Sequence, residues 1–161
     1  MKKVKRIGVF VDVQNIYYTT KQAFGRSFDY RKFWQDLEFY GDIVFANAYA
    51  IERNNEGQQR FQTALRSIGF EVKLKPYIQR SDGTSKGDWD VGITLDIINA
   101  AADLDMVVLL SGDGDFSLLL DKIRKQYGVT TYVYGVKKLT AKSLIDSSSK
   151  FTAIDTQFLQ K

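Results

Sequence analysis

The stretch "LLSGDGDFSLLL", residues 109–120, joins two blocks of leucine through two aspartates and two glycines. The leucines before the turn end an apolar run that is typical of a strand buried on both faces. Those after it begin a pattern that is typical of a helix facing a core. Asp113 and Asp115 place like charges at this junction. They form either a polar turn that needs glycine for its backbone angles or a site that awaits a cation, and the rest of the sequence has to distinguish between the two.

The pattern on both sides of this stretch alternates strand and helix. The expected strands are residues 6–13, 42–51, 70–78, 105–111, 129–135 and 150–154. The expected helices are residues 15–25, 29–41, 55–69, 89–102, 116–128 and 139–149, with a polar loop over 79–88. Such alternation implies a mostly parallel sheet with right-handed crossovers. We therefore expect an α/β fold, a three-layer α/β/α sandwich, in a single domain over residues 1–161.

The overall composition is that of a soluble globular protein, with 44% apolar and 26% charged residues among 161. No segment approaches the ~18 to 20 apolar residues that span a bilayer. The start, "MKKVKRIGVFVDVQN", has basic residues and an apolar run like a signal peptide. However, Asp12 interrupts the run and no small-residue cleavage site follows. We expect a cytoplasmic protein without a membrane partner.

Two missing residue types narrow the chemistry. The chain has no cysteine, which excludes disulfides, thiolate nucleophiles and cysteine-ligated zinc. It has no histidine, which excludes Ser-His-Asp triads and imidazole metal sites. Carboxylates remain, and they suit a hard cation such as Mg²⁺ or Mn²⁺. The net charge of +4 fits contact with a phosphate backbone, although ordinary solubility explains it equally well.

Aspartates recur where the predicted strands end. Asp12 closes the first strand and Asp113 follows the fourth, so both meet at one rim if these strands are neighbours. Asp90 begins a helix at the same edge. Asp96 lies six residues later, about 240° round an ideal helix, and need not face the same point. An acidic rim is what metal-assisted phosphodiester hydrolysis needs, because divalent ions lower the pKa of a coordinated water and neutralise the scissile phosphate.

Three blocks in the order "VFVDVQN", "KGDWDVGITLD" and "LLSGDGDF" resemble the NYN domain, in the LabA-like branch of the PIN-like nuclease superfamily. The resemblance covers roughly residues 5–154. It implies a Rossmann-like fold of the PIN type and ribonuclease activity with Mg²⁺ or Mn²⁺, with single-stranded RNA as the expected partner. It also implies direct metal ligation by Asp12, Asp90 and Asp113, further or outer ligation by Asp96 and Asp115, and site roles for Asn15 and for Lys86, which would hold the phosphate backbone.

The second block leaves one ambiguity. "KGDWD" puts two residues between its glycine and Asp90, so Asp88 is also a candidate ligand. We favour Asp90 because the "DVGITLD" that it begins keeps the family's register.

Each acidic residue also has a plain structural explanation. Asp113 and Asp115 suit a turn and a helix cap. Asp90 is favoured in the first turn of a helix by the macrodipole. Asp12 is harder to explain in this way, since an aspartate that ends a buried strand needs partners.

The neighbouring polar and aromatic residues have two interpretations as well. Asn15 suits a helix cap, Lys86 a solvated loop, and Ser111 either the orientation of a carboxylate or the end of a strand. The aromatic residues Tyr17, Tyr18 and Trp89 either stack on bases or belong to the core. Arg53, just after the second strand, is a candidate phosphate contact.

The sequence thus predicts a metal-dependent endoribonuclease. One alternative is a non-catalytic RNA- or protein-binding regulatory module of the same fold. Another is a small-molecule phosphatase or nucleotidase, although Gln14 replaces the second aspartate of a haloacid-dehalogenase nucleophile motif. Helices that line an open sheet can also pair, so a homodimer is a further expectation for which no face is identified.

Overall fold

The computed structural model describes residues 4–52, 55–76, 78–79, 85–86 and 89–161. Its strands are β1 (Arg6–Asp12), β2 (Asp42–Glu52), β3 (Glu71–Pro76), β4 (Ile78–Gln79), β5 (Ser85–Lys86), β6 (Met106–Leu110), β7 (Thr130–Gly135) and β8 (Lys150–Ala153). Its α-helices are α1 (Val13–Phe24), α2 (Tyr30–Leu37), α3 (Glu56–Ile68), α4 (Asp90–Ala101), α5 (Ser117–Tyr127) and α6 (Lys142–Ser147). Short 3-10 turns are η1 (Gly114–Phe116), η2 (Lys137–Leu139) and η3 (Thr156–Phe158).

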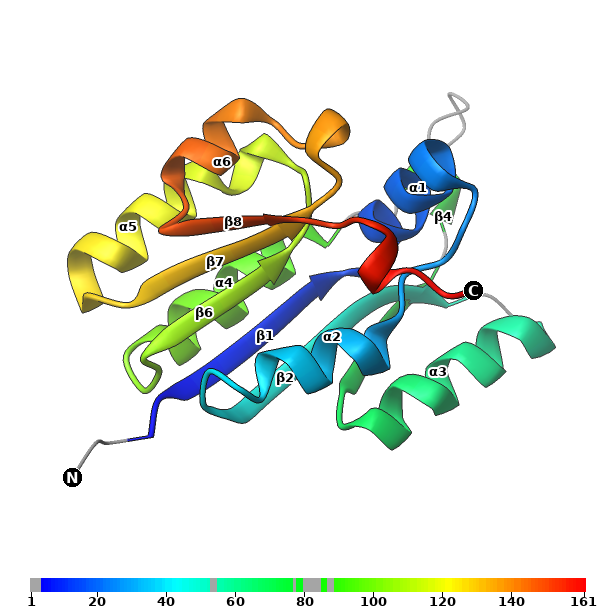
Figure 1. Cartoon of the computed structure of the whole chain (residues 1–161), viewed down its shortest axis with the longest axis horizontal. Coiled ribbons are helices and arrows are strands. Elements are labelled where there is room, and N and C mark those ends of the chain that lie inside the picture. The colour runs from blue at the N-terminus through cyan, green and yellow to red at the C-terminus, as the bar shows by residue number, and fades with distance from the viewer. Residues whose placement is uncertain (1–3, 53–54, 77, 80–84, 87–88) are drawn as a thin grey trace.

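Six strands form one sheet in the order β3-β2-β1-β6-β7-β8, and every neighbouring pair in it is parallel (Figure 1). The chain first builds outward from β1 through β2 to β3, then returns to β6 on the other side of β1. The direction of strand addition therefore reverses between β1 and β6. In open α/β sheets the carboxyl ends of the strands at such a reversal form the usual ligand crevice. The predicted α/β fold with a mostly parallel sheet is confirmed.

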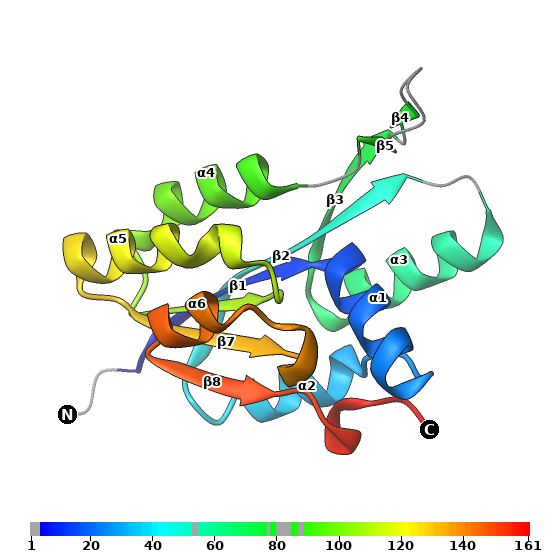
Figure 2. The same ribbon diagram turned by 90° about the horizontal axis from the view of Figure 1, so that it is seen from above.

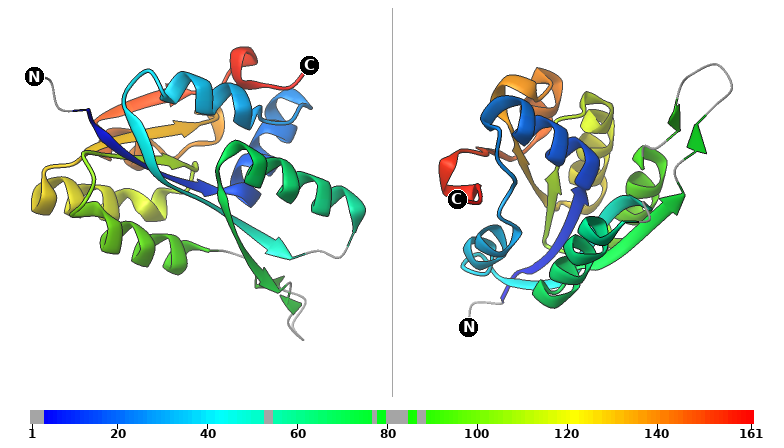
Figure 3. Two further views of the ribbon diagram at one scale, coloured as in Figure 1. Left: turned by 90° about the horizontal axis from the view of Figure 1, so that it is seen from below. Right: turned by 90° about the vertical axis from the view of Figure 1, so that its right-hand side faces the viewer.

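Helices cover both faces of this sheet, as the views from above and below show (Figures 2 and 3). One core packs α1, α2, α3 and the C-terminal segment against the sheet, and the other packs α4, α5 and α6. Strand β1 serves both cores: Val9 and Val11 face the first and Phe10 the second. This alternation is the period-2 pattern of a strand buried on both faces. Among the described residues no helix combines the length and apolar character that crossing a bilayer requires.

Glycines end two of the helices as expected. Gly25 and Gly128 follow α1 and α5 with φ of 66° and 68°, in the left-handed region that side chains disfavour. Each backbone N–H bonds to the carbonyl oxygen four residues earlier in its helix. These are left-handed C-caps, which close a helix at a defined residue.

The structure differs from the prediction after the third strand. A single strand over 70–78 is expected, but β3 stops at Pro76, and β4 instead pairs antiparallel with β5. The predicted polar loop thus contains part of a short hairpin, which projects from the sheet at the end of β3 (Figure 3). Proline explains the break, because it lacks the N–H that a sheet ladder uses and confines itself to edges and strand ends.

Candidate metal centre

Three carboxylates meet at the carboxyl edge of the sheet. Asp90, Asp113 and Asp115 each offer an oxygen, and these oxygens lie within 4.8 Å of one another. Asp90 is the first residue of α4, whereas Asp113 and Asp115 belong to the turn that follows β6. Two segments separated by a helix and a strand therefore bring like charges together. We call these three residues the acidic group.

Asp12 is linked to the acidic group through Ser111. Strands β1 and β6 are neighbours, and Val11 pairs with Leu110, so Asp12 and Ser111 end adjacent strands. The buried Ser111 hydroxyl donates to Asp12 Oδ2 at 3.1 Å and accepts from the backbone N–H of Asp113 at 3.1 Å. One hydroxyl thus orients a carboxylate and also fixes the turn that carries Asp113. The expectation that residues 12 and 113 share one rim is met, although Asp12 lies outside the acidic group.

Side-chain oxygens hold the turn after β6 in place. Asn15, in the first turn of α1, accepts from the backbone N–H of Gly112 at 2.9 Å. It therefore braces the neighbouring loop, and no side-chain hydrogen bond caps α1 at its N-cap residue, Asp12. Asp113 Oδ1 accepts from the backbone N–H of Asp115 at 2.9 Å and so caps η1. Asp113 therefore caps η1 and also belongs to the acidic group.

Close packing explains why this turn contains glycine. Gly112 and Gly114 do not have positive φ, so the turn does not need them for unusual backbone angles. A Cβ on Gly112 would lie 2.6 Å from the backbone oxygen of Leu139, and one on Gly114 would lie 2.8 Å from the Cβ of Ala141. The segment that joins η2 to α6 therefore presses against the acidic turn. Glycine is required because no side chain fits between them.

Trp89 anchors the beginning of α4. Its Nε1–H donates to the carbonyl oxygen of Ala50 in β2 at 2.8 Å, and its ring centroid lies 5.3 Å from that of Tyr49. Lys75 Nζ sits 4.6 Å from the Trp89 centroid, at cation–π distance. These contacts engage the Trp89 ring within the protein. They favour a packing role for Trp89 over stacking on a base. They also fix the position of Asp90, the next residue.

Asp96 belongs to a separate polar cluster. Its Oδ2 accepts from Lys73 Nζ at 2.9 Å and from the Tyr49 hydroxyl at 2.7 Å, and that hydroxyl accepts from Asn47 Nδ2 at 3.0 Å. We call Asp96, Lys73, Tyr49 and Asn47 the ion-pair group. Six residues advance about 9 Å along a helix, and this places Asp96 beside β2 and β3. The structure therefore does not bring Asp96 into the acidic group.

The ion-pair group sets the ionisation of its members. Burial favours protonated Asp96, but hydrogen bonds from Lys73 and Tyr49 outweigh it, and the pKa of Asp96 lies below its ordinary value of 3.8. Burial and the neighbouring Asp96 carboxylate raise the pKa of Tyr49 above its ordinary value of 10.0. The group therefore holds one carboxylate, one ammonium and a neutral phenol.

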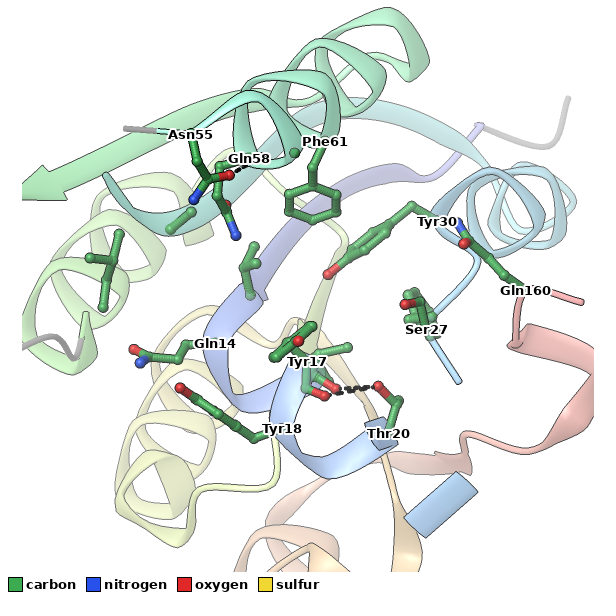
Figure 4. A pocket seen from close by; sticks show the side chains of 16 residues that line it. Gln14, Tyr17, Tyr18, Thr20, Ser27, Tyr30, Asn55, Gln58, Phe61 and Gln160 are labelled. Carbon is green, nitrogen blue, oxygen red and sulfur yellow. Dashed lines mark hydrogen bonds between the residues drawn. The ribbon is translucent and has the colours of Figure 1, made fainter. Parts of the chain in front are cut away.

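Several predicted residues cannot be placed in either group. Lys86 lies in β5, but its side chain is outside the part of the chain that the structure describes. Asp88 and Arg53 also lie outside the described residues. Tyr17 and Tyr18, on α1, are about half exposed and line a cavity between α1 and α3 (Figure 4).

The cavity contains residues that the sequence analysis did not single out. Tyr30 and Gln58 line it together with Tyr17 and Tyr18. Burial, reinforced by the negative charge of Asp12, raises the pKa of Tyr30 above its ordinary value of 10.0. Tyr30 lies in the helix predicted over residues 29–41, and nothing in that sequence pattern distinguishes it from an ordinary core residue.

The donor set of the acidic group fits a divalent cation. Carboxylate oxygens are the ligands that Mg²⁺ and Mn²⁺ prefer. Mg²⁺ holds oxygens at about 2.0–2.1 Å, so ligands on opposite sides of it stand about 4.2 Å apart. The oxygens of the acidic group, which lie within 4.8 Å of one another, would draw closer together around such an ion. The same group thus combines suitable chemistry with suitable spacing.

Comparison with known proteins agrees with the fold. Residues 6–155 match the NYN domain family. The low amplitude and bright protein LabA of Synechococcus elongatus is 28% identical over 167 residues, which cover 97% of this chain and 88% of LabA.

Solved structures agree at the level of the backbone. A Vibrio parahaemolyticus protein of unknown function is 51% identical, with a TM-score of 0.94 over 99% of this chain and 100% of that one. A ribokinase from Giardia lamblia shares the fold alone, at 10% identity and a TM-score of 0.52, over 96% of this chain and 59% of the kinase.

Proposed function

This chain belongs to the NYN domain family, as a relative of LabA, and from that premise we propose that it is a metal-dependent endoribonuclease. The family is generally nuclease-like. The observation that carries the proposal is the acidic group, in which three carboxylates from two distant segments stand within 4.8 Å of one another at the switch point of the sheet. Clustered carboxylates cost stability unless a cation joins them, and phosphodiester hydrolysis uses such cations.

Asp90, Asp113 and Asp115 would hold Mg²⁺ or Mn²⁺. The ion would supply Lewis acidity, which makes water a better nucleophile and offsets the negative charge of the phosphate. Because Asp12 stands outside the acidic group, we assign it a positioning role through Ser111. Asn15 has the same kind of role, since it fixes Gly112 next to Asp113. Lys86, on the hairpin, would bind the phosphate backbone.

Cleavage of a labelled single-stranded RNA with Mn²⁺ or Mg²⁺ tests this function. We expect internal cleavage that EDTA abolishes and that Asp90→Asn or Asp113→Asn reduces strongly. Asp146→Asn is the matched control, because Asp146 is an exposed aspartate on α6 that is not part of the acidic group. Cleavage that persists in EDTA, or full activity in both site variants, would rule out the mechanism.

The same assay separates the two alternatives. Tight RNA binding in EDTA without any turnover would indicate a regulatory binding module. Release of phosphate from mononucleotides, with intact RNA, would indicate a phosphatase or nucleotidase.

The remaining parts of the proposal concern partners and location. Single-stranded RNA is the proposed substrate, and the net charge of +4 favours contact with its backbone. A cytoplasmic location is consistent with the absence of cysteine. We also propose a homodimer, which the molar mass of the protein in solution tests directly.

A further inference from the structure

A cavity of about 570 Å³ lies close to the acidic group, on the face of the sheet that α1 and α3 cover. The first turn of α1 separates the two sites. Asn15 reaches to Gly112 beside the acidic turn, whereas Gln14 and Tyr18 line the cavity. Val13, which directly follows β1, borders it together with Ala50 and Ile51 near the end of β2. The cavity therefore opens at the same carboxyl edge as the candidate metal centre.

The cavity wall combines aromatic rings with uncharged amides. None of the described residues that line it is charged. Its volume lies within the roughly 300–1,000 Å³ of small-ligand pockets. A wall of this kind offers little to a phosphate or a carboxylate, but it suits a flat, neutral heterocycle. The rings and amides are those of Tyr17, Tyr18, Tyr30, Phe61, Gln14, Asn55, Gln58 and Gln160.

Tyr30 presents a hydroxyl to this space. Its side chain is only 7% exposed. Figure 4 shows that hydroxyl directed into the cavity. Edge-to-face contacts with Phe28, Phe61 and Phe70, at centroid distances of 4.8, 5.8 and 5.9 Å, hold the ring in place. Because these contacts fix the ring, the Tyr30 hydroxyl is a preorganised donor at the cavity wall.

Gln58 offers the complementary amide. Asn55 Oδ1 accepts from the backbone N–H of Gln58 at 2.8 Å and caps α3, which fixes the first turn of the helix. The side-chain amide of Gln58 is directed toward the cavity (Figure 4). A carboxamide carries a donor and an acceptor side by side, which matches the edge of a nucleobase.

We propose that this cavity binds a nucleobase of the RNA strand, next to the phosphate that lies at the acidic group. The proposal rests on the proposed ribonuclease function for the identity of the strand. Tyr17 or Tyr18 supplies an exposed ring on which a base can stack. Tyr30 and Gln58 read the edge of the base. The cavity would thus determine which nucleotide stands beside the cleaved bond.

Titration with the four ribonucleosides tests base binding without any contribution from phosphate. The full chain in EDTA is titrated with adenosine, guanosine, cytidine and uridine, and binding is followed by NMR chemical shifts. We expect one or two nucleosides to saturate at millimolar concentration. Tyr30→Phe and Gln58→Leu should each weaken that binding about fivefold, because each removes a hydrogen bond worth roughly 1 kcal/mol. Absence of saturation by all four nucleosides overturns the proposal.

Two matched controls show whether the effect is local. Gln59→Leu changes the next residue on α3, which is exposed and outside the cavity lining. Tyr127→Phe removes a hydroxyl at the end of α5, on the other face of the sheet. Both controls should bind as the unchanged protein does. Equal binding in Tyr30→Phe, Gln58→Leu and the controls places the nucleoside elsewhere and overturns the proposal.

Short homopolymeric RNA strands distinguish a base within RNA from a free nucleoside. The strand made of the preferred base should bind more tightly than its nucleoside, since backbone contacts add to the base contact. A nucleoside that binds while its strand does not would overturn the assignment to RNA. These titrations contain EDTA, so they do not depend on cleavage. If a base binds but RNA is not cleaved, only the proposed nuclease function is refuted. If RNA is cleaved but no base binds, only the proposed role of the cavity is refuted.

Discussion

Helix α4 carries two aspartates whose surroundings are opposite. Asp90, at its first residue, stands with two other carboxylates in the acidic group. Asp96, further along the same helix, holds Lys73 at 2.9 Å and the Tyr49 hydroxyl at 2.7 Å. Lys73 balances the charge of Asp96, whereas Asp90 shares its surroundings with two other carboxylates. One residue type on one helix therefore stands in two different electrostatic surroundings.

The difference is one of free energy as well as of position. The ion-pair group is partly shielded, with 27% of the Asp96 side chain and 33% of the Lys73 side chain exposed, so its attraction is screened less than that of a surface pair. In the acidic group like charges lie closer than the Debye length and repel. A function that needs a cation fits the acidic group, and a contribution to stability fits the ion-pair group. The following experiments test this division.

The largest expected difference between the two groups is in catalysis. Asp113→Asn should reduce RNA cleavage more than about 100-fold, because even outer-shell partners of a metal are worth 10–100-fold. Asp96→Asn should retain cleavage within a few-fold when the protein is assayed well below its unfolding temperature. Initial rates with Mn²⁺ measure both variants. Equal losses in the two variants would erase the distinction between the groups.

Metal binding should stabilise the protein through the acidic group alone. A ligand at 100 times its dissociation constant adds about 2.7 kcal/mol to the free energy of unfolding. We expect Mn²⁺ to raise the Tm of the unchanged protein and of Asp96→Asn, and to have little effect on Asp113→Asn. Thermal unfolding with Mn²⁺ and with EDTA measures the shift. If Mn²⁺ no longer raised the Tm of Asp96→Asn, metal binding would depend on Asp96, which contradicts its assignment to the acidic group.

In the absence of metal, the ion-pair group should contribute more to the stability of the protein than the acidic group does. Asp96→Asn should lower the free energy of unfolding by about 1–2 kcal/mol, since hydrogen bonds to charged groups are worth about 1.5–3 kcal/mol and this pair is partly exposed. Urea unfolding in EDTA measures the loss, and a double-mutant cycle with Lys73→Met isolates the coupling between the two side chains. A coupling energy near zero would show that the pair is only a surface contact.

The fold was predictable because its signals are local. Apolar runs and terminal glycines such as Gly25 and Gly128 locate the elements, and strict alternation of strand and helix restricts the connections to parallel ones. The missed detail, the break at Pro76, depends on whether the chain finds another partner after β3. That partner is β5, a strand of two residues whose pattern is too short to predict.

The candidate site was predictable only in part. Strand ends locate Asp12 and Asp113 on one rim, because neighbouring parallel strands end together. Asp96 could not be assigned in this way. It lies on α4 and its partner Lys73 on β3, so their contact depends on how the helix crosses the sheet. The cavity is harder still. Tyr30 and Gln58 come from different helices and follow ordinary amphipathic patterns, so only the assembled fold brings them together.

The ion-pair group should also respond to pH. The pKa of folded Asp96 lies below 3.8, so its charge stabilises the fold fully above that value, and the contribution is lost as the pH falls through the lower folded-state pKa. The stability difference between the unchanged protein and Asp96→Asn should therefore shrink in acid, where a protonated aspartate resembles asparagine. Urea unfolding of both proteins at about pH 7 and about pH 3 measures it. A difference that grows in acid would contradict the lowered pKa.

The smallest effect is also the most specific to the acidic group. Asp115→Asn removes one charge from three neighbouring carboxylates and should stabilise the metal-free protein by about 0.5 kcal/mol, the size of a like-charge contact on a helix surface. The backbone N–H of Asp115, which binds Asp113, is unaffected by this change. Added Mn²⁺ should reverse the order, because the variant then lacks a ligand. Unfolding in EDTA and in Mn²⁺, with Asp146→Asn as control, measures both signs. A variant that is destabilised in EDTA would mean that the protein already balances these charges, and the contrast between the two ends of α4 would disappear.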